Sequence, residues 1–187
     1  MYLDLLKRCL LNEMYLDDEL RLLYLRACLS GEETFDFATY HDIRAALPEQ
    51  FEKLRAARSI GQFMDRNIRN SGFSHTMIGR ARLNGLHVCL DKIIGDGIPG
   101  DLMECGVWRG GACIFMAGYL RDHGIGGRKV ILADSFEGLP VSQKEPDKGL
   151  QLDKSAYPEL AVSLDEVKAN FAAYGLLEAH IHFLKIP

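Results

Sequence analysis

A glycine-rich turn is the sharpest chemical signal in this sequence of 187 residues. It reads Glu-Cys-Gly-Val-Trp-Arg-Gly-Gly from Glu104 to Gly111, where a short apolar strand is expected to lead into a helix. Glycine lets the backbone turn tightly and approach a ligand without an intervening side chain. The amides at a helix start favour polar or anionic groups. An ordinary strand-to-helix connection looks the same, so this turn alone supports a binding site and a plain connection about equally.

Asp134 is the second signal, because it ends the next apolar strand along the chain. An acidic residue there accepts hydrogen bonds from ribose hydroxyls in nucleotide sites, although it can also cap a helix. The two signals together favour a nucleoside-containing cofactor. The NAD fingerprint G-x-G-x-x-G fails, since Trp108 stands two positions after Gly106. A glutamate two positions before the first glycine, here Glu104, is instead typical of S-adenosylmethionine sites.

The first part of the chain is expected to be helical. Leucines at helical spacing predict one or two amphipathic helices over 2–29, ending near Gly31. Further helix is predicted over 42–69, interrupted at Pro48, and over 76–94. A loop rich in glycine and proline follows.

Strands and helices then alternate. An unbroken apolar run predicts a buried parallel strand at 129–134. Further short strands are predicted at 101–105, which is mostly apolar, and at 180–184. A helix is expected over 112–120, and another begins at Ser163 with Glu166 completing a capping box and Gly175 closing it. A long loop covers 138–162. This order predicts an α/β fold with right-handed parallel crossovers.

Composition excludes several classes of protein. Hydrophobic residues make up 48% and charged residues 26% of the chain, as in ordinary globular domains. A formal net charge of -4 argues against a nucleic-acid partner. The chain shows no secretory signal and no membrane span, and its five cysteines form no C-x-x-C pair. We therefore expect a cytoplasmic protein that has neither a membrane partner nor a cysteine metal site.

Several ordered segments resemble the macrocin, mycinamicin and novobiocin family of sugar O-methyltransferases. They are His75–Gly79, Gly97–Asp101, Glu104–Ala112, Ala133–Pro140, Leu160–Val167 and Tyr174–Leu177, together with the opening Tyr2–Leu6. The resemblance covers most of 73–184 and is weak over 12–72. It implies a Rossmann-like class I methyltransferase fold with an N-terminal helical region over 1–72. An S-adenosylmethionine-binding α/β domain would follow over 73–187, incomplete at its C-terminal end.

The resemblance also implies an activity and a set of cofactor contacts. Family members methylate a hydroxyl of a sugar on a natural product in antibiotic biosynthesis, with S-adenosylmethionine as donor and usually with Mg²⁺. The implied contacts are Thr76, Met77, Glu104, Cys105, Gly106, Val107, Trp108, Asp134, Ser135, Phe136, Glu137, Gly138 and Ser163. Asp134 would bind the ribose hydroxyls, with Ser135–Gly138 lining the adenosine pocket and Ser163 near the adenine. Without the resemblance, Trp108 and Phe136 would be interpreted as core residues.

Parts of the family pattern lie outside this chain. The loop over 141–160 lacks the histidine often found there, so no catalytic base is identified. The aspartates that bind Mg²⁺ in the family would follow Pro187, so we expect no metal ligands here. With three strands, 102–105 would form an exposed edge, which predicts marginal stability, or pairing with a second copy or another chain. The alternatives to an active enzyme are a truncated, inactive cofactor-binding or interaction protein and, against the failed fingerprint, a NAD-dependent oxidoreductase.

Overall fold

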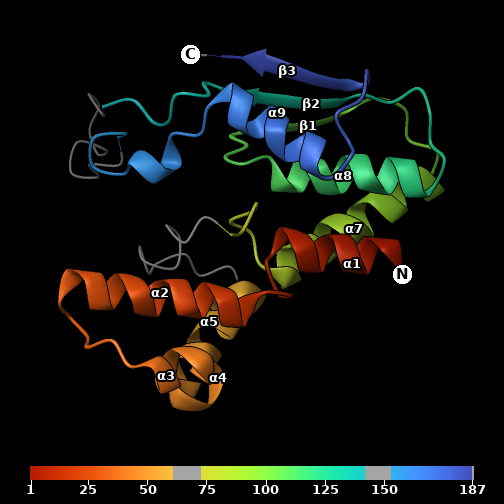
Figure 1. Cartoon of the computed structure of the whole chain (residues 1–187). Coiled ribbons are helices and arrows are strands. Elements are labelled where there is room, and N and C mark those ends of the chain that lie inside the picture. The colour runs from red at the N-terminus through yellow and green to blue at the C-terminus, as the bar shows by residue number, and fades with distance from the viewer. Residues whose placement is uncertain (61–72, 142–152, 187) are drawn as a thin grey trace. The chain divides into compact units, whose positions relative to one another are not determined.

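The structure, a computed structural model, describes residues 1–60, 73–141 and 153–186. Contacts divide the chain into two compact units, Asp4–Gly85 and Met1–Leu3 with Leu86–Pro187. The first is helical and the second holds a parallel sheet (Figure 1). The elements are α1 (Tyr2–Leu10), α2 (Leu16–Ser30), α3 (Phe37–His41), α4 (Ile43–Ala46), α5 (Pro48–Ile60), α7 (Arg80–Gly95), β1 (Leu102–Cys105), α8 (Gly111–Asp122), β2 (Val130–Asp134), the 3₁₀ turn η2 (Pro158–Leu160), α9 (Leu164–Ala173) and β3 (Ile181–Lys185). None of the helices in these ranges combines the length and hydropathy that a membrane crossing needs.

The helical unit is built around the apolar faces of α2, α4 and α5. Its core consists of Leu16, Leu20, Tyr24, Ile43, Phe51, Leu54 and Ala57. The stretch predicted as one or two helices forms two, and α2 ends at Gly31 in the left-handed conformation, as expected. Pro48 begins α5, where its missing amide donor is tolerated. The predicted continuation of this helix to residue 69 lies outside the described residues.

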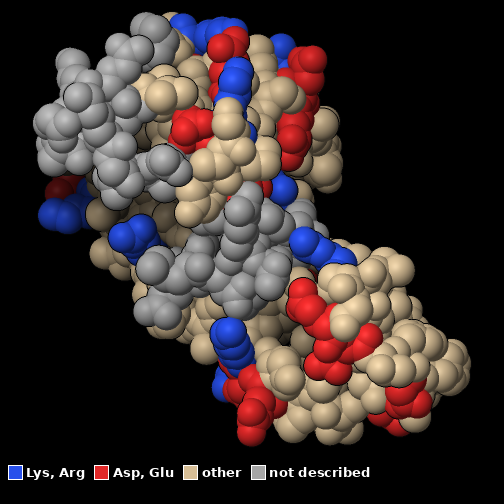
Figure 2. All heavy atoms as spheres, turned by 90° about the vertical axis from the view of Figure 1, so that its left-hand side faces the viewer, with Lys and Arg blue, Asp and Glu red and all other residues tan. Residues whose placement is uncertain are grey.

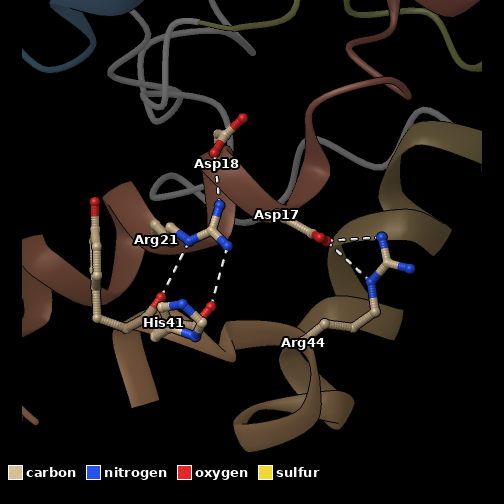
Figure 3. Close-up of polar contacts among 6 residues, drawn as sticks. Asp17, Asp18, Arg21, His41 and Arg44 are labelled. Carbon is tan, nitrogen blue, oxygen red and sulfur yellow. Dashed lines mark hydrogen bonds and ion pairs between the residues drawn. The ribbon is translucent and has the colours of Figure 1, made fainter. Parts of the chain in front are cut away.

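Arginine side chains fasten α2 to the short helices that follow it. Arg21 donates from Nε and Nη2 to the carbonyl oxygens of Tyr40 and His41, at 3.1 and 3.3 Å (Figure 3). Arg44 on α4 donates from Nε and Nη2 to Asp17 Oδ1 on α2, at 3.0 and 2.8 Å. The Arg21 contacts satisfy two backbone carbonyls at the end of α3, whereas the Arg44 pair is more exposed.

The helix predicted to start at residue 76 starts instead at Arg80, so this part of the prediction was wrong. Side chains of the preceding residues bond to the backbone in place of a helical turn. Ser74 Oγ donates to the Thr76 carbonyl at 2.7 Å, and Thr76 Oγ1 accepts from the Ile78 amide at 3.3 Å. Serine and threonine side chains commonly compete with helix formation in this way.

The sheet of the second unit has strand order β1-β2-β3, with both pairs parallel. Leu102 pairs with Val130, and Val130 with Ile181, so alternate residues of each strand share a face. Helices α8 and α9 cover the same face (Figure 1). Glu104 on this face contacts Cys113 of α8, and Phe183 contacts Phe171 of α9 with ring centroids 6.0 Å apart. Residues 111–120 of α8 are all buried, as expected for an apolar helix between layers.

The opposite face of the sheet is more open. Met103 on β1 and Leu184 on β3 point to this side and are 52% and 47% exposed. Within the described residues, β1 and β3 form the two edges of the sheet. The predicted pairing of β1 with another chain stays a prediction.

Charges on the surface are mixed in sign. On the face seen in Figure 2, basic and acidic side chains are interspersed rather than gathered into a continuous basic area. The predicted absence of a nucleic-acid partner stays a prediction.

Candidate cofactor-binding site

The turn between β1 and α8 depends on two glycines for different reasons. Gly106 and Gly110 both lie in the left-handed region, at φ +80° and +82°. A Cβ atom on Gly106 would meet nothing within 4 Å, whereas one on Gly110 would lie 3.0 Å from Val167 Cγ1 and 3.2 Å from Phe171 Cε2. Gly110 thus allows α9 to pack closely against the turn. Gly106 leaves an open backbone surface that a ligand can approach.

Asp134, at the end of β2, ties this turn to the next one. Its Oδ2 accepts from the Val107 amide at 2.7 Å, and its Oδ1 accepts from the Phe136 amide at 2.9 Å. The carboxylate therefore bridges the turns after β1 and β2 and does not cap a helix. Each carboxylate oxygen can accept more than one hydrogen bond, so acceptor capacity is left for a ligand.

Two residues of these turns have strained backbones. Trp108 and Phe136 adopt φ +48° and +55°, which is uncommon for residues other than glycine. The indole of Trp108 donates to the Glu159 carbonyl at 2.9 Å, and the Phe136 ring contacts Phe183 at a centroid distance of 6.5 Å. Both side chains are buried. Such strain persists only where the surroundings enforce it and is concentrated at functional sites.

The end of β1 adds a second carboxylate beside Asp134. Burial raises the pKa of Glu104, a hydrogen bond from the Cys113 thiol lowers it, and the negative charge of Asp134 raises it. The donor of that bond, Cys113 Sγ, lies 3.1 Å from Glu104 Oε2. Two neighbouring carboxylates favour a cationic ligand, and S-adenosylmethionine carries a sulfonium and an ammonium group.

A cavity of about 480 Å³ adjoins the turn after β2. It is lined by Ser135, Glu137, Gly138, Leu139, Pro140, Lys154, Lys185 and Ile186. Lys185 Nζ lies 2.5 Å from Glu137 Oε1, and this bond lowers the pKa of Glu137. Three of the four residues predicted to line the adenosine pocket, Ser135, Glu137 and Gly138, thus line a hollow at the carboxyl ends of β2 and β3, where ligands bind in open α/β sheets. Their contact with the cofactor stays a prediction.

The structure brings together most of the predicted contacts. Residues 104–108 and 134–138 lie on adjacent turns that Asp134 joins. Ser163 caps α9, and its Oγ accepts from the Glu166 amide at 3.2 Å, as predicted. Its approach to an adenine stays a prediction. Thr76 and Met77 belong to the other unit, so their contact with the cofactor also stays a prediction.

Sequence reasoning missed two contributors to this site. Cys113 was considered only as one of the five cysteines that form no C-x-x-C pair, although a small polar residue in the first turn of the helix after a binding motif is a usable signal. Lys185 ends β3 beside the turn after β2 and pairs with Glu137, which becomes visible only once the parallel register is known.

A metal centre is not apparent in the described ranges. No group of three or more His, Cys, Asp or Glu side chains there could hold an ion.

Comparison with known proteins places this geometry in a family. The sequence model of the family described as Macrocin-O-methyltransferase (TylF) matches residues 1–186. The 8-demethyl-8-(2,3-dimethoxy-alpha-L-rhamnosyl)-tetracenomycin-C 4'-O-methyltransferase of Streptomyces olivaceus is 46% identical over 114 residues, or 59% of this chain and 43% of the relative. The demethyldecarbamoylnovobiocin O-methyltransferase of Streptomyces niveus is 44% identical over 125 residues, or 63% and 47%. The mycinamicin III 3''-O-methyltransferase of Micromonospora griseorubida is 44% identical over 115 residues, or 59% and 45%.

A solved structure confirms the predicted Rossmann-like class I methyltransferase fold. The O-methyltransferase NovP matches with a TM-score of 0.68 and 34% identity, over 97% of this chain and 62% of that chain. The chain spans about half the length of the curated relatives it matches. It belongs to the macrocin-O-methyltransferase (TylF) family.

Proposed function

We propose that this chain binds S-adenosylmethionine at the carboxyl ends of β1 and β2. We further propose that the protein transfers the methyl group to a hydroxyl of a sugar or glycosylated natural product. The observation that carries the proposal is the position of Asp134, whose carboxylate joins the turns after β1 and β2. Beside it lie a second carboxylate and the open backbone of Gly106.

The residues present suit this cofactor. Asp134 would accept hydrogen bonds from the ribose hydroxyls, and Glu104 would face the positively charged methionine end. Gly106 would leave room for the cofactor against the backbone, and Trp108 would shield it from water. When bound, S-adenosylmethionine would supply an electrophilic methyl group on a sulfonium. The carbon–sulfur bond would break as the acceptor oxygen takes the methyl group, S-adenosylhomocysteine would leave, and the hydroxyl proton would pass to water or to a base.

The acceptor class is proposed from the relatives. The names of the three relatives specify a rhamnosyl-bearing tetracenomycin, demethyldecarbamoylnovobiocin and mycinamicin III. A glycosylated natural product is therefore the acceptor class to test first. The described residues contain no group of three or more His, Cys, Asp or Glu side chains that could hold Mg²⁺, so no step is assigned to this ion. A cytoplasmic location and pairing with a second copy or chain belong to the same proposal.

Calorimetry with S-adenosylhomocysteine tests cofactor binding, with NAD as the control ligand. Asp134→Asn should weaken binding by roughly 10- to 100-fold, because hydrogen bonds to a charged partner contribute about 1.5–3 kcal/mol each. Asp122→Asn removes the same charge at the exposed far end of α8 and should leave binding unchanged. A folded wild-type chain that does not bind the ligand, or that binds NAD equally well, would refute the proposal.

A further inference from the structure

Cys113 occupies an unusual place for a buried thiol. It is the third residue of α8 and 0% exposed. A free cysteine usually packs as a small hydrophobic residue and needs no polar partner. Here Sγ lies 3.1 Å from Oε2 of Glu104, a residue near the end of β1. The thiol thus touches the one carboxylate that β1 contributes to the candidate site.

The direction of this hydrogen bond follows from the surroundings of the thiol. Burial raises the pKa of Cys113 well above its ordinary value, and the adjacent charge of Glu104 raises it further. The thiol therefore keeps its proton over the physiological range and acts as the donor, with the carboxylate as the acceptor.

The surroundings of Glu104 oppose its ionisation, and the thiol is a hydrogen-bond donor that favours it. Burial raises the pKa of its carboxyl group, and so does the charge of Asp134 on β2. The Cys113 thiol from α8 is the influence that opposes them. Asp134 on β2 and Cys113 on α8 are the titratable groups that act on the pKa of Glu104 among the described residues. A hydrogen bond to the charged form favours ionisation, and only the ionised form attracts a cation.

We propose that Cys113 is a positioning residue of the candidate site, whose thiol holds the Glu104 carboxylate ionised and fixed to receive the cationic methionine end of S-adenosylmethionine. The inference rests on the proposed function and assigns to α8 a part in recognising the methyl donor, S-adenosylmethionine. Cys113 acts through Glu104 and does not itself touch the cofactor.

Three substitutions separate the effect of losing the hydrogen-bond donor at position 113 from the effect of changing the volume of the side chain. Cys113→Ser keeps a donor, Cys113→Ala removes it, and Cys113→Val removes it while filling the space. Ile114→Val changes the next residue of the same helix, which is equally buried, and serves as the control for a packing defect. Thermal unfolding establishes that each variant is folded before it is compared.

Two measurements on the full chain read out the effect. The first is the ¹³C titration of the Glu104 carboxyl group in the free protein, assigned with Glu104→Gln. The second is the affinity for S-adenosylmethionine across the same pH range. Loss of the donor should move the Glu104 titration to higher pH in the Ala and Val variants. Their affinity near neutral pH should fall about fivefold, in keeping with the loss of one modest hydrogen bond.

The Ser variant and the Ile114→Val control should titrate and bind as the wild type does. Superimposable Glu104 titrations in the wild type and the Val variant would overturn the inference, and so would a Ser variant that follows the Ala variant. Absence of S-adenosylmethionine binding in the folded wild type would instead count against the proposed function, and the free-protein titration would still decide whether the thiol controls Glu104.

Discussion

Substitutions at Gly106 and Gly110 test two roles of the same turn separately. Gly110 allows packing against α9, and Gly106 allows access for a ligand. Both have φ near +80°, so replacing either with alanine places an L side chain in the left-handed region. That conformation costs about 1–2 kcal/mol per residue. Gly106→Ala should therefore lower the free energy of unfolding by roughly that amount, since the new methyl group meets nothing within 4 Å.

Gly110→Ala should lower the free energy of unfolding further. Its methyl group would lie 3.0 Å from Val167 Cγ1 and 3.2 Å from Phe171 Cε2, and both side chains are buried. Overpacking of this kind costs typically about 1–3 kcal/mol. The combined loss is then about 2–5 kcal/mol, enough to bring a domain of ordinary stability close to its unfolding threshold.

Binding should show the opposite order. Gly106→Ala should weaken S-adenosylhomocysteine binding by about tenfold or more, because the methyl group intrudes where the cofactor would approach. Gly110→Ala, under conditions where it is folded, should bind within a few-fold of the wild type. Urea unfolding followed by the fluorescence of Trp108, the only tryptophan, gives the stabilities, and calorimetry gives the affinities.

The reasoning has clear points of failure. Equal destabilisation by the two substitutions would mean that α9 does not pack against Gly110 as described. Unchanged binding in a folded Gly106→Ala chain would mean that the open backbone surface is not where the cofactor lies.

Three further predictions concern other residues. Arg21→Ala should lower the free energy of unfolding of the helical unit by about 1–2 kcal/mol, because it leaves two carbonyl oxygens of α3 without their donor. The more exposed Arg44→Ala should lower it by less than about 1 kcal/mol, in a urea titration followed by circular dichroism, since Trp108 lies in the other unit. The raised pKa of Glu104 means that the wild-type chain should gain stability as pH falls through that pKa. Glu104→Gln should be more stable than the wild type at neutral pH and should lack this gain, as thermal unfolding would show. The same substitution should weaken S-adenosylmethionine binding, as calorimetry would show. Burial, with a hydrogen bond to Asp91, raises the pKa of Tyr119 to about 12, so its contribution to stability should be complete below the ordinary tyrosine pKa and lost as pH rises towards 12. Urea midpoints over that alkaline range should fall less steeply in Tyr119→Phe.

The strand–turn–helix frame was predictable because its signals are local. The run that leads into Asp134 is continuously apolar, as in a buried strand, and the run that ends at Cys105 is apolar except for Glu104. The observed strands end at Cys105 and Asp134. Ser163 was recognisable as a cap because its hydroxyl serves an amide only three residues away. Gly31 likewise marks the end of a helix by its own conformational freedom.

Features that depend on distant partners were not predictable. The left-handed backbones of Trp108 and Phe136 contradict local preference and persist because tertiary contacts with Glu159 and Phe183 hold them. The delayed start of α7 came from side-chain bonds at Ser74, which the apolar pattern does not record. Pairing of Cys113 with Glu104 required knowledge of which face of β1 lies under α8.

The parallel register also has a consequence for the order in which the sheet assembles. β1 pairs with β2 across the segment 106–129, whereas β2 pairs with β3 across the longer segment 135–180. The entropy lost on closing a loop grows with its length, by about 0.6 kcal/mol per doubling, and distant pairings slow folding. We therefore expect β1, α8 and β2 to form the folding nucleus and β3 to join late. A cavity made in α8 should then chiefly slow folding, whereas one made at Phe171 of α9 should chiefly speed unfolding.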